Sequence, residues 1–411
     1  MTTFFDLGVP RPIAAALEDR GIATPFPIQA SSIPDALAGH DILGRAPTGS
    51  GKTLAFGIAA LSRVQQAEPR RPRALILAPT RELAGQIATE LKPLAKAMRR
   101  WILVVHGGVG YDHQRRQLRR GVDVLVATPG RLADLIEEGS VSLTDVDLVV
   151  VDEADRMADM GFMPQVRRLL DQTSPSRQTL LFSATLDGEV AELTRRYQDQ
   201  PLRHEVADTD DPGDAAHYFW AVSREDRIGV AAEVISSSTP SIVFTRTRSG
   251  AERVARQLRR AGVRTESIHG GRSQAQRSRA LSAFSEGKVA ALVATDVAAR
   301  GIHVDRVASV IHFDLPADPK DYLHRSGRTA RAGEDGVVVS FVLPDQRRQL
   351  SALQRSVGLA QLVHDPASDW LTGELGSRLG TAPVSTPRPR RGSRGTSGGR
   401  SRRSRDNRRR R

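Results

Sequence analysis

The chain is 411 residues long, contains no cysteine and carries a formal net charge of +13. The length is sufficient for two domains, and the absence of cysteine excludes disulfides, thiol catalysis and thiolate metal sites. Residues 381–411 hold 12 arginines and one aspartate, or +11 of the net charge, so the rest of the chain is close to neutral. No run approaches the roughly 20 apolar residues of a membrane span, and Met1 to Arg11 lacks a signal-peptide pattern, so we expect a cytoplasmic protein without membrane contact.

Residues 1–39 are predicted to form a helical segment packed on the first domain. Helical spacing from Ile13 to Glu18 ends at Gly21, and a second helix begins at Ile28-Gln29 after two prolines.

A phosphate-binding loop is predicted between a strand and a helix. Its glycines allow successive backbone amides to converge on one anion at the start of the helix. Lys52 would reach the outer phosphates, and the Thr53 hydroxyl would hold Mg²⁺. The usual pattern begins with glycine, where this chain has Ala46, and a glycine-rich turn without a ligand is the alternative. The ATP-binding residues expected in this loop are Ala46, Pro47, Thr48, Gly49, Ser50, Gly51, Lys52 and Thr53.

Short apolar runs alternate with helical patterns over residues 40–200, which is typical of a parallel sheet flanked by helices. Residues 201–216 are acidic and aperiodic and are predicted to be a linker, and a second α/β domain is predicted at 217–363. Residues 364–411 form an extension whose arginine-rich part, from about 381, cannot bury a core and is predicted to be disordered. Strands are expected at 74–78, 102–105, 123–127, 148–151 and 179–182, then at 241–244, 264–268, 289–294, 307–313 and 336–343. Helices are expected at 53–61, 81–92 and 131–137, then at 250–261 and 274–284.

Two acids follow the predicted buried strand 148–151. Side chains at the carboxyl end of such a strand lie beside the phosphate loop. Asp152 would therefore hold Mg²⁺ through water, and Glu153 would orient or deprotonate the water that attacks ATP. The alternative is an acidic helix start, which aspartate and glutamate favour in any case.

Asp152-Glu153-Ala154-Asp155, together with the phosphate loop, resembles the DEAD-box helicases of superfamily 2, and the resemblance covers about residues 4–345. It implies two tandem RecA-like domains. Phe4 and residues 25–29 resemble the Q motif, in which Gln29 would read the adenine edge and Phe4 would pack on the base. An amide can pair bidentately with adenine, so the resemblance implies ATP as the nucleotide. Phe26 stands where threonine is common.

Further motifs in the first half resemble the family's RNA contacts and its coupling element. Three of them directly follow predicted strands, where hydroxyls, helix-start amides and arginine can meet phosphates, although a helix cap or turn is the alternative for each one. The expected RNA-binding residues here are Thr80, Arg81, Glu82, Gly107, Gly108, Thr128, Pro129, Gly130 and Arg131. The residues expected to link the nucleotide site to strand separation are Asp155, Ser183, Ala184 and Thr185.

The second half resembles the part of the family that completes the ATPase site. His324 to Arg331 resembles motif VI, in which Arg328 and Arg331 would neutralise charge on the γ-phosphate after the domains close. His324 would seat this interface. In the segment resembling motif V, His303 stands where aspartate usually meets the ribose. The expected RNA contacts of this half are Arg246, Gly270, Gln274, Thr295, Asp296 and Arg300.

The resemblance implies an RNA-dependent ATPase that couples ATP binding and hydrolysis, with Mg²⁺, to local and largely sequence-independent RNA strand separation or ribonucleoprotein remodelling. The expected partners are structured or duplex RNA and ribonucleoprotein or ribosome-assembly factors, and we expect a monomer. The basic tail would add a salt-sensitive hold on RNA, and a solubilising extension or a protein-binding segment is the alternative for it. The compact core with a basic tail resembles the bacterial RhlE-like subgroup. A non-unwinding ATP-gated RNA clamp and a DNA-directed superfamily 2 translocase are the alternatives.

Overall fold

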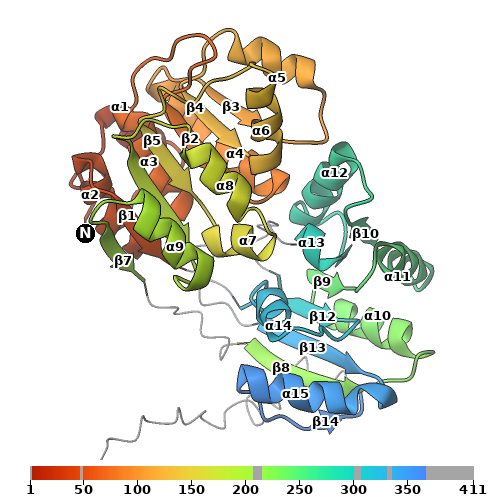
Figure 1. Ribbon diagram of the computed structural model, residues 1–411. Coiled ribbons are helices and arrows are strands. Elements are labelled where there is room, and N and C mark those ends of the chain that lie inside the picture. The colour runs from red at the N-terminus through yellow and green to blue at the C-terminus, as the bar shows by residue number, and fades with distance from the viewer. Residues whose placement is uncertain (1, 47–49, 207–214, 300–306, 331–335, 367–411) are drawn as a thin grey trace, which may run out of the picture.

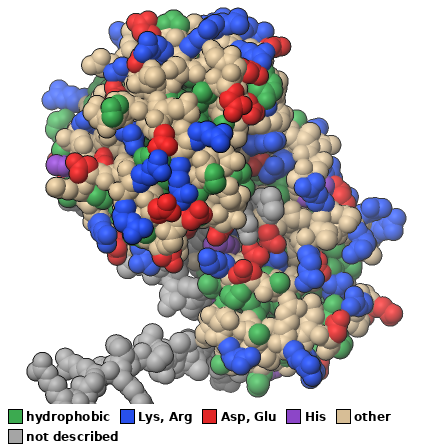
Figure 2. Space-filling model, in the orientation of Figure 1, with side chains coloured by type: hydrophobic (Ala, Val, Ile, Leu, Met, Phe, Trp, Pro, Cys, Tyr) green, Lys and Arg blue, Asp and Glu red, His purple; other side chains and the backbone are tan. Residues whose placement is uncertain are grey.

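The computed structural model of the chain describes residues 2–46, 50–206, 215–299, 307–330 and 336–366 (Figure 1). Within these ranges the chain forms two α/β domains, each built on a parallel sheet, as the sequence predicts. Of the helices in these ranges, none combines the length and the apolar character that crossing a bilayer requires. Figure 2 shows basic and acidic side chains interspersed over one face of both domains, in line with the nearly neutral charge outside the tail.

Seven parallel strands form the sheet of the first domain, in the order β3-β4-β2-β5-β6-β1-β7. They are β1 (Ile42–Arg45), β2 (Ala74–Leu77), β3 (Ile102–Val105), β4 (Val124–Ala127), β5 (Leu148–Val151), β6 (Gln178–Ser183) and β7 (Leu202–Glu205). The central strands are buried on both faces, so neighbouring residues enter separate cores. Val150 packs on one side of the sheet and Val149 on the other.

Helices cover both faces of this sheet (Figure 1). Side chains of α1 to α4 fill the first core, and those of α5 to α9 fill the second. The helices are α1 (Arg11–Glu18), α2 (Pro27–Ala38), α3 (Lys52–Arg63), α4 (Arg81–Ala97), α5 (Tyr111–Leu118), α6 (Pro129–Glu137), α7 (Ala154–Asp159), α8 (Met163–Leu170) and α9 (Gly188–Tyr197).

The second domain repeats this architecture with the strand order β10-β11-β9-β12-β13-β8-β14. Its strands are β8 (Ala215–Ala221), β9 (Ser241–Phe244), β10 (Thr265–Ile268), β11 (Ala291–Ala294), β12 (Ser309–His312), β13 (Gly336–Val342) and β14 (Val363–His364). Its helices are α10 (Arg227–Ser237), α11 (Arg248–Arg260), α12 (Gln274–Ser285), α13 (Asp296–Ala299), α14 (Pro319–Ser326) and α15 (Arg347–Val357), with a 3₁₀ turn η2 (Pro344–Gln346) before α15.

The shared strand order gives each strand of one sheet a counterpart in the other. β2 corresponds to β9, β3 to β10 and β1 to β8. Loops at the carboxyl ends of corresponding strands therefore occupy equivalent places in the two domains. The phosphate loop follows β1, whereas its counterpart after β8, residues 222–226, contains neither glycine nor lysine.

The predicted linker at 201–216 is wrong at both of its ends. β7 lies within it and pairs with β1, held by backbone hydrogen bonds such as Leu202 N to Asp41 O at 2.8 Å. The sequence conceals β7 because an exposed edge strand needs no apolar side chains. At the other end, β8 begins at Ala215 and pairs with β13. Residues 207–214 lie outside the described residues.

Helix α4 extends to Ala97, five residues beyond its predicted end at Lys92. The sequence places a proline at position 93, which normally ends a helix because it removes a backbone donor. Pro93 is exposed, and the next two residues, Leu94 and Ala95, are buried in the core. Their burial stabilises the helical turn that follows the proline.

Candidate functional site

Gln29 joins the amino-terminal segment to the phosphate loop. Its side chain is 1% exposed; Nε2 donates to the Gly51 carbonyl at 2.9 Å, and Oε1 accepts from the Phe26 amide at 2.8 Å. Gly51 has φ +85°, and a Cβ there would collide with the Gln29 amide and the Phe26 ring. The residue predicted to read adenine is therefore fixed against the loop predicted to bind the phosphates.

Two phenylalanines of the amino-terminal segment have different surroundings. Phe4, which the sequence places on the adenine base, is 3% exposed and packed in the core with α1 and α2. Phe26 is 55% exposed and its ring lies beside Gly51. Phe26 is therefore the aromatic side chain of this segment that is open to a ligand at the phosphate loop, and sequence reasoning treated it only as a departure from threonine.

Lys52 closes the phosphate loop on itself. It begins α3, and its buried ammonium donates to the Ala46 carbonyl at 2.7 Å. The hydrogen bond joins the first residue of the predicted motif to its lysine, even though Ala46 replaces the usual glycine. The structure describes the carboxyl half of the loop, from Ser50 to Thr53, and α3 begins within it at Lys52. The remaining loop residues, Pro47, Thr48 and Gly49, lie outside the described residues.

The two acids after β5 are buried at the carboxyl end of that strand, as predicted. Burial raises the pKa of Asp152 to about 7, against the opposing effect of the Lys52 ammonium. Glu153 has φ +50° and pairs with Arg156, whose Nη1 lies 2.5 Å from its Oε2. Sequence reasoning missed Arg156. Its position three residues after Glu153, one turn along α7, was the available signal.

Asp155 and Ser183 connect the ends of two neighbouring strands. The Ser183 hydroxyl accepts from the Asp155 amide at 3.2 Å and donates to the Thr185 carbonyl at 2.6 Å. The Ala184 carbonyl accepts from Arg45 Nε at 3.3 Å. Ser183 thus joins two of the other predicted coupling residues, Asp155 and Thr185, directly after the predicted catalytic acids, whereas Ala184 is bonded to Arg45.

The second domain contributes Arg328, which follows α14 and is buried. Its Nε donates to the His324 carbonyl at 3.2 Å, so the backbone of one predicted residue orients the other. The other predicted finger, Arg331, lies outside the described residues, as do Arg300 and His303.

Asp296, a predicted RNA contact, is engaged by a neighbour within its own domain. Arg325 Nε lies 2.5 Å and its Nη2 2.8 Å from the two Asp296 carboxylate oxygens, and Nη1 donates to the Asp314 carbonyl at 2.8 Å. Arg325 is buried, so this bidentate pair ties the start of α13 to α14. Thr295, immediately before Asp296, is also buried and reaches Ile268 through its backbone amide.

The two domains touch through Glu82 and Gln274, both predicted to contact RNA. Glu82 Oε1 accepts from Gln274 Nε2 at 2.9 Å, and its other oxygen pairs with Arg277 at 2.9 Å. Burial lowers the pKa of Arg277, and the Glu82 carboxylate opposes this effect. A second, solvent-exposed ion pair joins Lys320 at the start of α14 to Asp159 at the end of α7, at 3.9 Å. Both contacts connect elements that carry predicted site residues.

Arg81 lies against a pair of glycines in the first domain. A Cβ on Gly107 or Gly108 would collide with its guanidinium, and Gly108 has φ +80°. The Thr80 hydroxyl accepts from the Leu83 amide at 3.2 Å and caps α4, so the alternative of a helix cap holds for this hydroxyl. The three predicted RNA residues Arg81, Gly107 and Gly108 do form one cluster.

The remaining predicted RNA residues of the first domain surround the start of α6. Thr128 is its N-cap residue, Pro129 is buried and Gly130 is exposed. Arg131 stacks on Tyr111, with its guanidinium carbon 3.9 Å from the ring centroid, and donates to the Val109 carbonyl at 3.0 Å. Its guanidinium is thus held between α5 and α6, largely out of solvent.

The second domain repeats the arginine and glycine cluster. Thr247 caps α11 as Thr80 caps α4, and Arg248 packs on Gly270 and Gly271 as Arg81 packs on its glycines. Arg248 is exposed and was missed by sequence reasoning, because its likeness to Arg81 becomes visible only from the equivalent strand order of the two folded domains. The predicted Arg246, two residues earlier, donates through Nη2 to the Leu315 carbonyl at 3.3 Å.

Two known protein families match the chain. "DEAD/DEAH box helicase" matches residues 26–193, and "Helicase conserved C-terminal domain" matches residues 227–333. The two matched segments correspond to the two α/β domains and include Gln29, Asp152 and Arg328.

Known proteins are similar over most of the chain. The ATP-dependent RNA helicase RhlB of Pseudomonas syringae pv. tomato is 41% identical over 369 residues, which cover 87% of this chain and 93% of that protein. DEAD-box ATP-dependent RNA helicase 3A, chloroplastic, of Zea mays is 43% identical over 365 residues, 86% of this chain and 49% of that protein, so the chain spans about half the length of the maize relative. Among solved structures, S. cerevisiae Dbp5 bound to RNA and ADP BeF3 has a TM-score of 0.78 and 28% identity, covering 90% of this chain and 97% of that chain.

Proposed function

The chain belongs to the DEAD/DEAH box helicase family, and on this premise we propose that it is an RNA-stimulated ATPase that uses ATP to separate RNA strands locally or to remodel ribonucleoproteins. One observation carries the proposal. The residues suited to ATP hydrolysis are divided between two domains, and those domains are joined by the contact of Glu82 with Gln274. A nucleotide site divided in this way is complete only when the domains are together, so a strand bound across both would promote hydrolysis.

The residues of the first domain would bind and activate the nucleotide. Gln29 pairs with the adenine edge, and Lys52 exchanges the Ala46 carbonyl for the outer phosphates of ATP. Glu153, held by Arg156, orients the attacking water at the γ-phosphate. Arg328 approaches from the second domain and offsets the negative charge that develops on the transferred phosphoryl oxygens. The other predicted finger, Arg331, has the same role in this proposal.

The oxygen ligands available here suit Mg²⁺. Asp152 is a buried carboxylate whose pKa is raised by burial, and a divalent cation would favour its charged form. Thr53 supplies a hydroxyl at the start of α3, and Mg²⁺ commonly takes few protein ligands together with waters and phosphates. Within the described residues no group of three or more acidic or histidine side chains forms a metal site, which fits an ion brought in largely by the nucleotide. When bound, Mg²⁺ would neutralise phosphate charge.

RNA would lie along the carboxyl ends of the strands of both sheets. Arg81 with its glycines and Arg248 with Gly270 would hold sugar and phosphate, which carries no base specificity. The structured RNA substrate, ribonucleoprotein or ribosome-assembly partners, monomeric state, cytoplasmic location and RhlE-like subgroup remain predictions. So does the role of the basic tail, which lies outside the described residues.

Turnover and strand displacement together test the proposal. We expect RNA, and not DNA of the same sequence, to stimulate ATP hydrolysis, and we expect Glu153→Gln to abolish hydrolysis while RNA and ATP remain bound. DNA stimulation equal to that by RNA would favour the translocase instead. RNA-stimulated hydrolysis without displacement of a short duplex would favour the clamp.

A further inference from the structure

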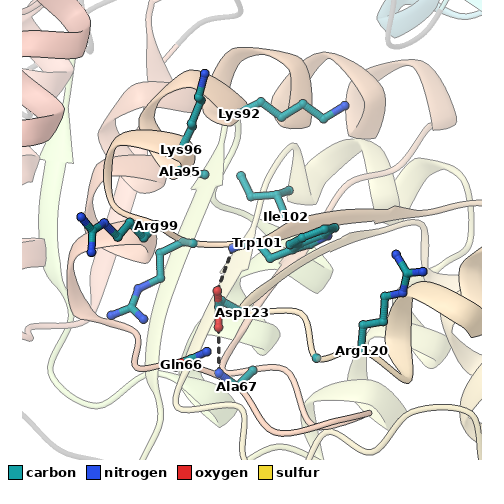
Figure 3. A pocket seen from close by; sticks show the side chains of 12 residues that line it. Gln66, Ala67, Lys92, Ala95, Lys96, Arg99, Trp101, Ile102, Arg120 and Asp123 are labelled. Carbon is teal, nitrogen blue, oxygen red and sulfur yellow. Dashed lines mark hydrogen bonds between the residues drawn. The ribbon is translucent and has the colours of Figure 1, made fainter.

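A cavity of about 600 Å³ opens in the first domain, away from the proposed RNA path (Figure 3). Its walls come from the end of α4, the start of β3, the loop between α5 and β4, and residues 66–67 after α3. Thr80, Gly107 and Thr128 lie at the carboxyl ends of β2, β3 and β4, whereas the cavity lies at the amino ends of β3 and β4. Strands of four residues span roughly 13 Å, so the cavity and the proposed RNA path lie at opposite ends of the strands, about that far apart. The volume is in the range of small-ligand sites, about 300–1,000 Å³.

Cations dominate this cavity. Its lining contains the cationic side chains Lys92, Lys96, Arg99, Arg100 and Arg120 and the aromatic side chain Trp101. Within the described part of the chain, none of the five cationic side chains forms an ion pair, and Arg100 has a buried Nε without a hydrogen-bond partner. Helices α4 and α5 both end here, and their carbonyl ends favour nearby cations, which explains how so much positive charge is tolerated.

Asp123, the acidic residue of the cavity lining, is hydrogen-bonded to backbone amides. Asp123 is buried, and its two carboxylate oxygens accept from the Ala67 and Trp101 amides, each at 2.7 Å (Figure 3). Asp123 therefore fixes the floor of the cavity and the backbone of Trp101. A single fixed carboxylate cannot balance five cations, so the cavity favours an anionic ligand.

Trp101 gives the cavity an aromatic surface. Its side chain is 52% exposed, and Figure 3 shows it between the side chains of α4 and Arg120. An indole presented to solvent among cations is suited to stack on a flat base whose phosphates meet the surrounding ammonium and guanidinium groups. An acidic peptide would engage the cations and would not require the exposed indole.

We propose that this cavity is an auxiliary site for single-stranded RNA, in which a base stacks on Trp101 and adjoining phosphates contact Lys92, Lys96 and Arg120. The choice of RNA over a free nucleotide, which offers the same base and phosphate chemistry, rests on the proposed function. An RNA strand bound in the cavity is also held close to the proposed RNA path. Its effective concentration at that path therefore rises without any new contact there.

Fluorescence of Trp101 tests the proposal directly. The full chain also contains Trp220, which is buried, and Trp370, so the signal of Trp101 is the difference between the natural chain and Trp101→Phe. Single-stranded oligoadenylate of about 16 nucleotides is the probe, a length at the upper end of common single-strand site sizes. We expect oligoadenylate to quench the difference signal and AMP at the same nucleotide concentration to leave it unchanged.

Affinity measurements supply the second readout. We expect Trp101→Ala and the double variant Lys92→Ala/Arg120→Ala each to raise the RNA dissociation constant about tenfold, because stacking and phosphate contacts are lost. Trp101→Phe should remain within about twofold of the natural chain because it keeps an aromatic face. Arg116→Ala/Arg119→Ala removes the same charge from exposed positions at the end of α5 outside the cavity, and it is the matched control. The rate of ATP hydrolysis at saturating RNA should be unchanged in all variants.

Three results would overturn the proposal. One is a Trp101 difference signal that oligoadenylate does not quench, together with an RNA dissociation constant that the cavity variants do not change. The second is quenching by AMP that RNA does not compete away, which would assign the cavity to free nucleotides. The third is a response to polyglutamate and none to RNA, which would assign it to acidic peptides. RNA-stimulated hydrolysis by the natural chain is recorded in the same preparation. Its absence would contradict the proposed function alone, whereas its presence with any of the three results would contradict the cavity proposal alone.

Discussion

Gln274 of the second domain donates a hydrogen bond to Glu82 of the first, 192 residues earlier in the chain, at 2.9 Å. Arg277, one turn further along α12, pairs with the same carboxylate. Because Glu82 and Arg277 are both largely removed from water, the contact favours one arrangement of the two domains over others.

Removing Glu82 should weaken domain closure. In Glu82→Ala, Arg277 would lose its partner while remaining partly buried, which is costly for a charged group. We expect the RNA concentration for half-maximal ATPase stimulation to rise roughly 10- to 100-fold. Replacement of the exposed Glu137 on α6 by alanine is the matched control. A double variant with Arg277→Ala should recover part of the loss, and strictly additive effects would show that the pair does not act as a unit.

Phe26 should influence nucleotide affinity. Its exposed ring lies beside Gly51, where a base held by Gln29 could pack on it. We expect Phe26→Thr to raise the KM for ATP about fivefold at unchanged kcat, and Phe26→Tyr to have little effect, because the tyrosine keeps the aromatic face. Phe5 has the same exposed fraction, 55%, and its ring lies against the Arg11 guanidinium, so Phe5→Thr is the control. Equal changes in both variants would point to a general effect on the segment.

Ser183 should couple hydrolysis to strand separation. Ser183→Ala removes the hydrogen bonds that its hydroxyl makes with the Asp155 amide and the Thr185 carbonyl. The residues placed at ATP stay in position, so we expect hydrolysis within about threefold of the natural rate and duplex displacement reduced about tenfold, as expected for the loss of buried hydrogen bonds. Both rates are measured on one RNA duplex. A parallel fall in the two rates would mean that Ser183 supports catalysis itself.

Stability should fall in mild acid because of His312. This imidazole is fully buried, and burial, with the nearby Arg325 and His217, holds its pKa well below the ordinary 6.5. Below pH 6.5 the unfolded chain binds a proton that the folded chain excludes, so the free energy of unfolding falls by about 1.4 kcal/mol per pH unit from this group. His312→Asn should flatten the pH dependence of urea unfolding between about pH 5 and pH 6.5. His113, exposed on α5, is the control, and an unchanged slope in His312→Asn would contradict the prediction.

Much of the fold could be predicted because the central strands are continuous apolar runs. Strands 148–151 and 241–244 match their predicted bounds, since burial on both faces leaves a strong sequence signal. The edge strand β7 and the last turn of α4 could not be predicted, because β7 is held by backbone pairing and the end of α4 by tertiary packing.

The site could be predicted as a set of motifs but not as a set of contacts. Lys52, Asp152 and Glu153 lie where the motifs place them. The partnership of Asp296 with Arg325, and the interdomain contacts of Glu82, depend on how separate elements dock, which residue spacing does not encode. Arg248 was missed for the same reason, because its role depends on Gly270 and Gly271, which lie beside it only in the folded domain. Arg156 differs, since its position three residues after Glu153 can be read from the sequence.

The loop after β8 has a consequence for stoichiometry. It occupies the place that the phosphate loop has after β1, yet it lacks glycine and lysine. Under the proposed function, only the loop after β1 has the residues to bind the phosphates of a nucleotide, so we expect one ATP to be consumed for each round of domain opening and closing.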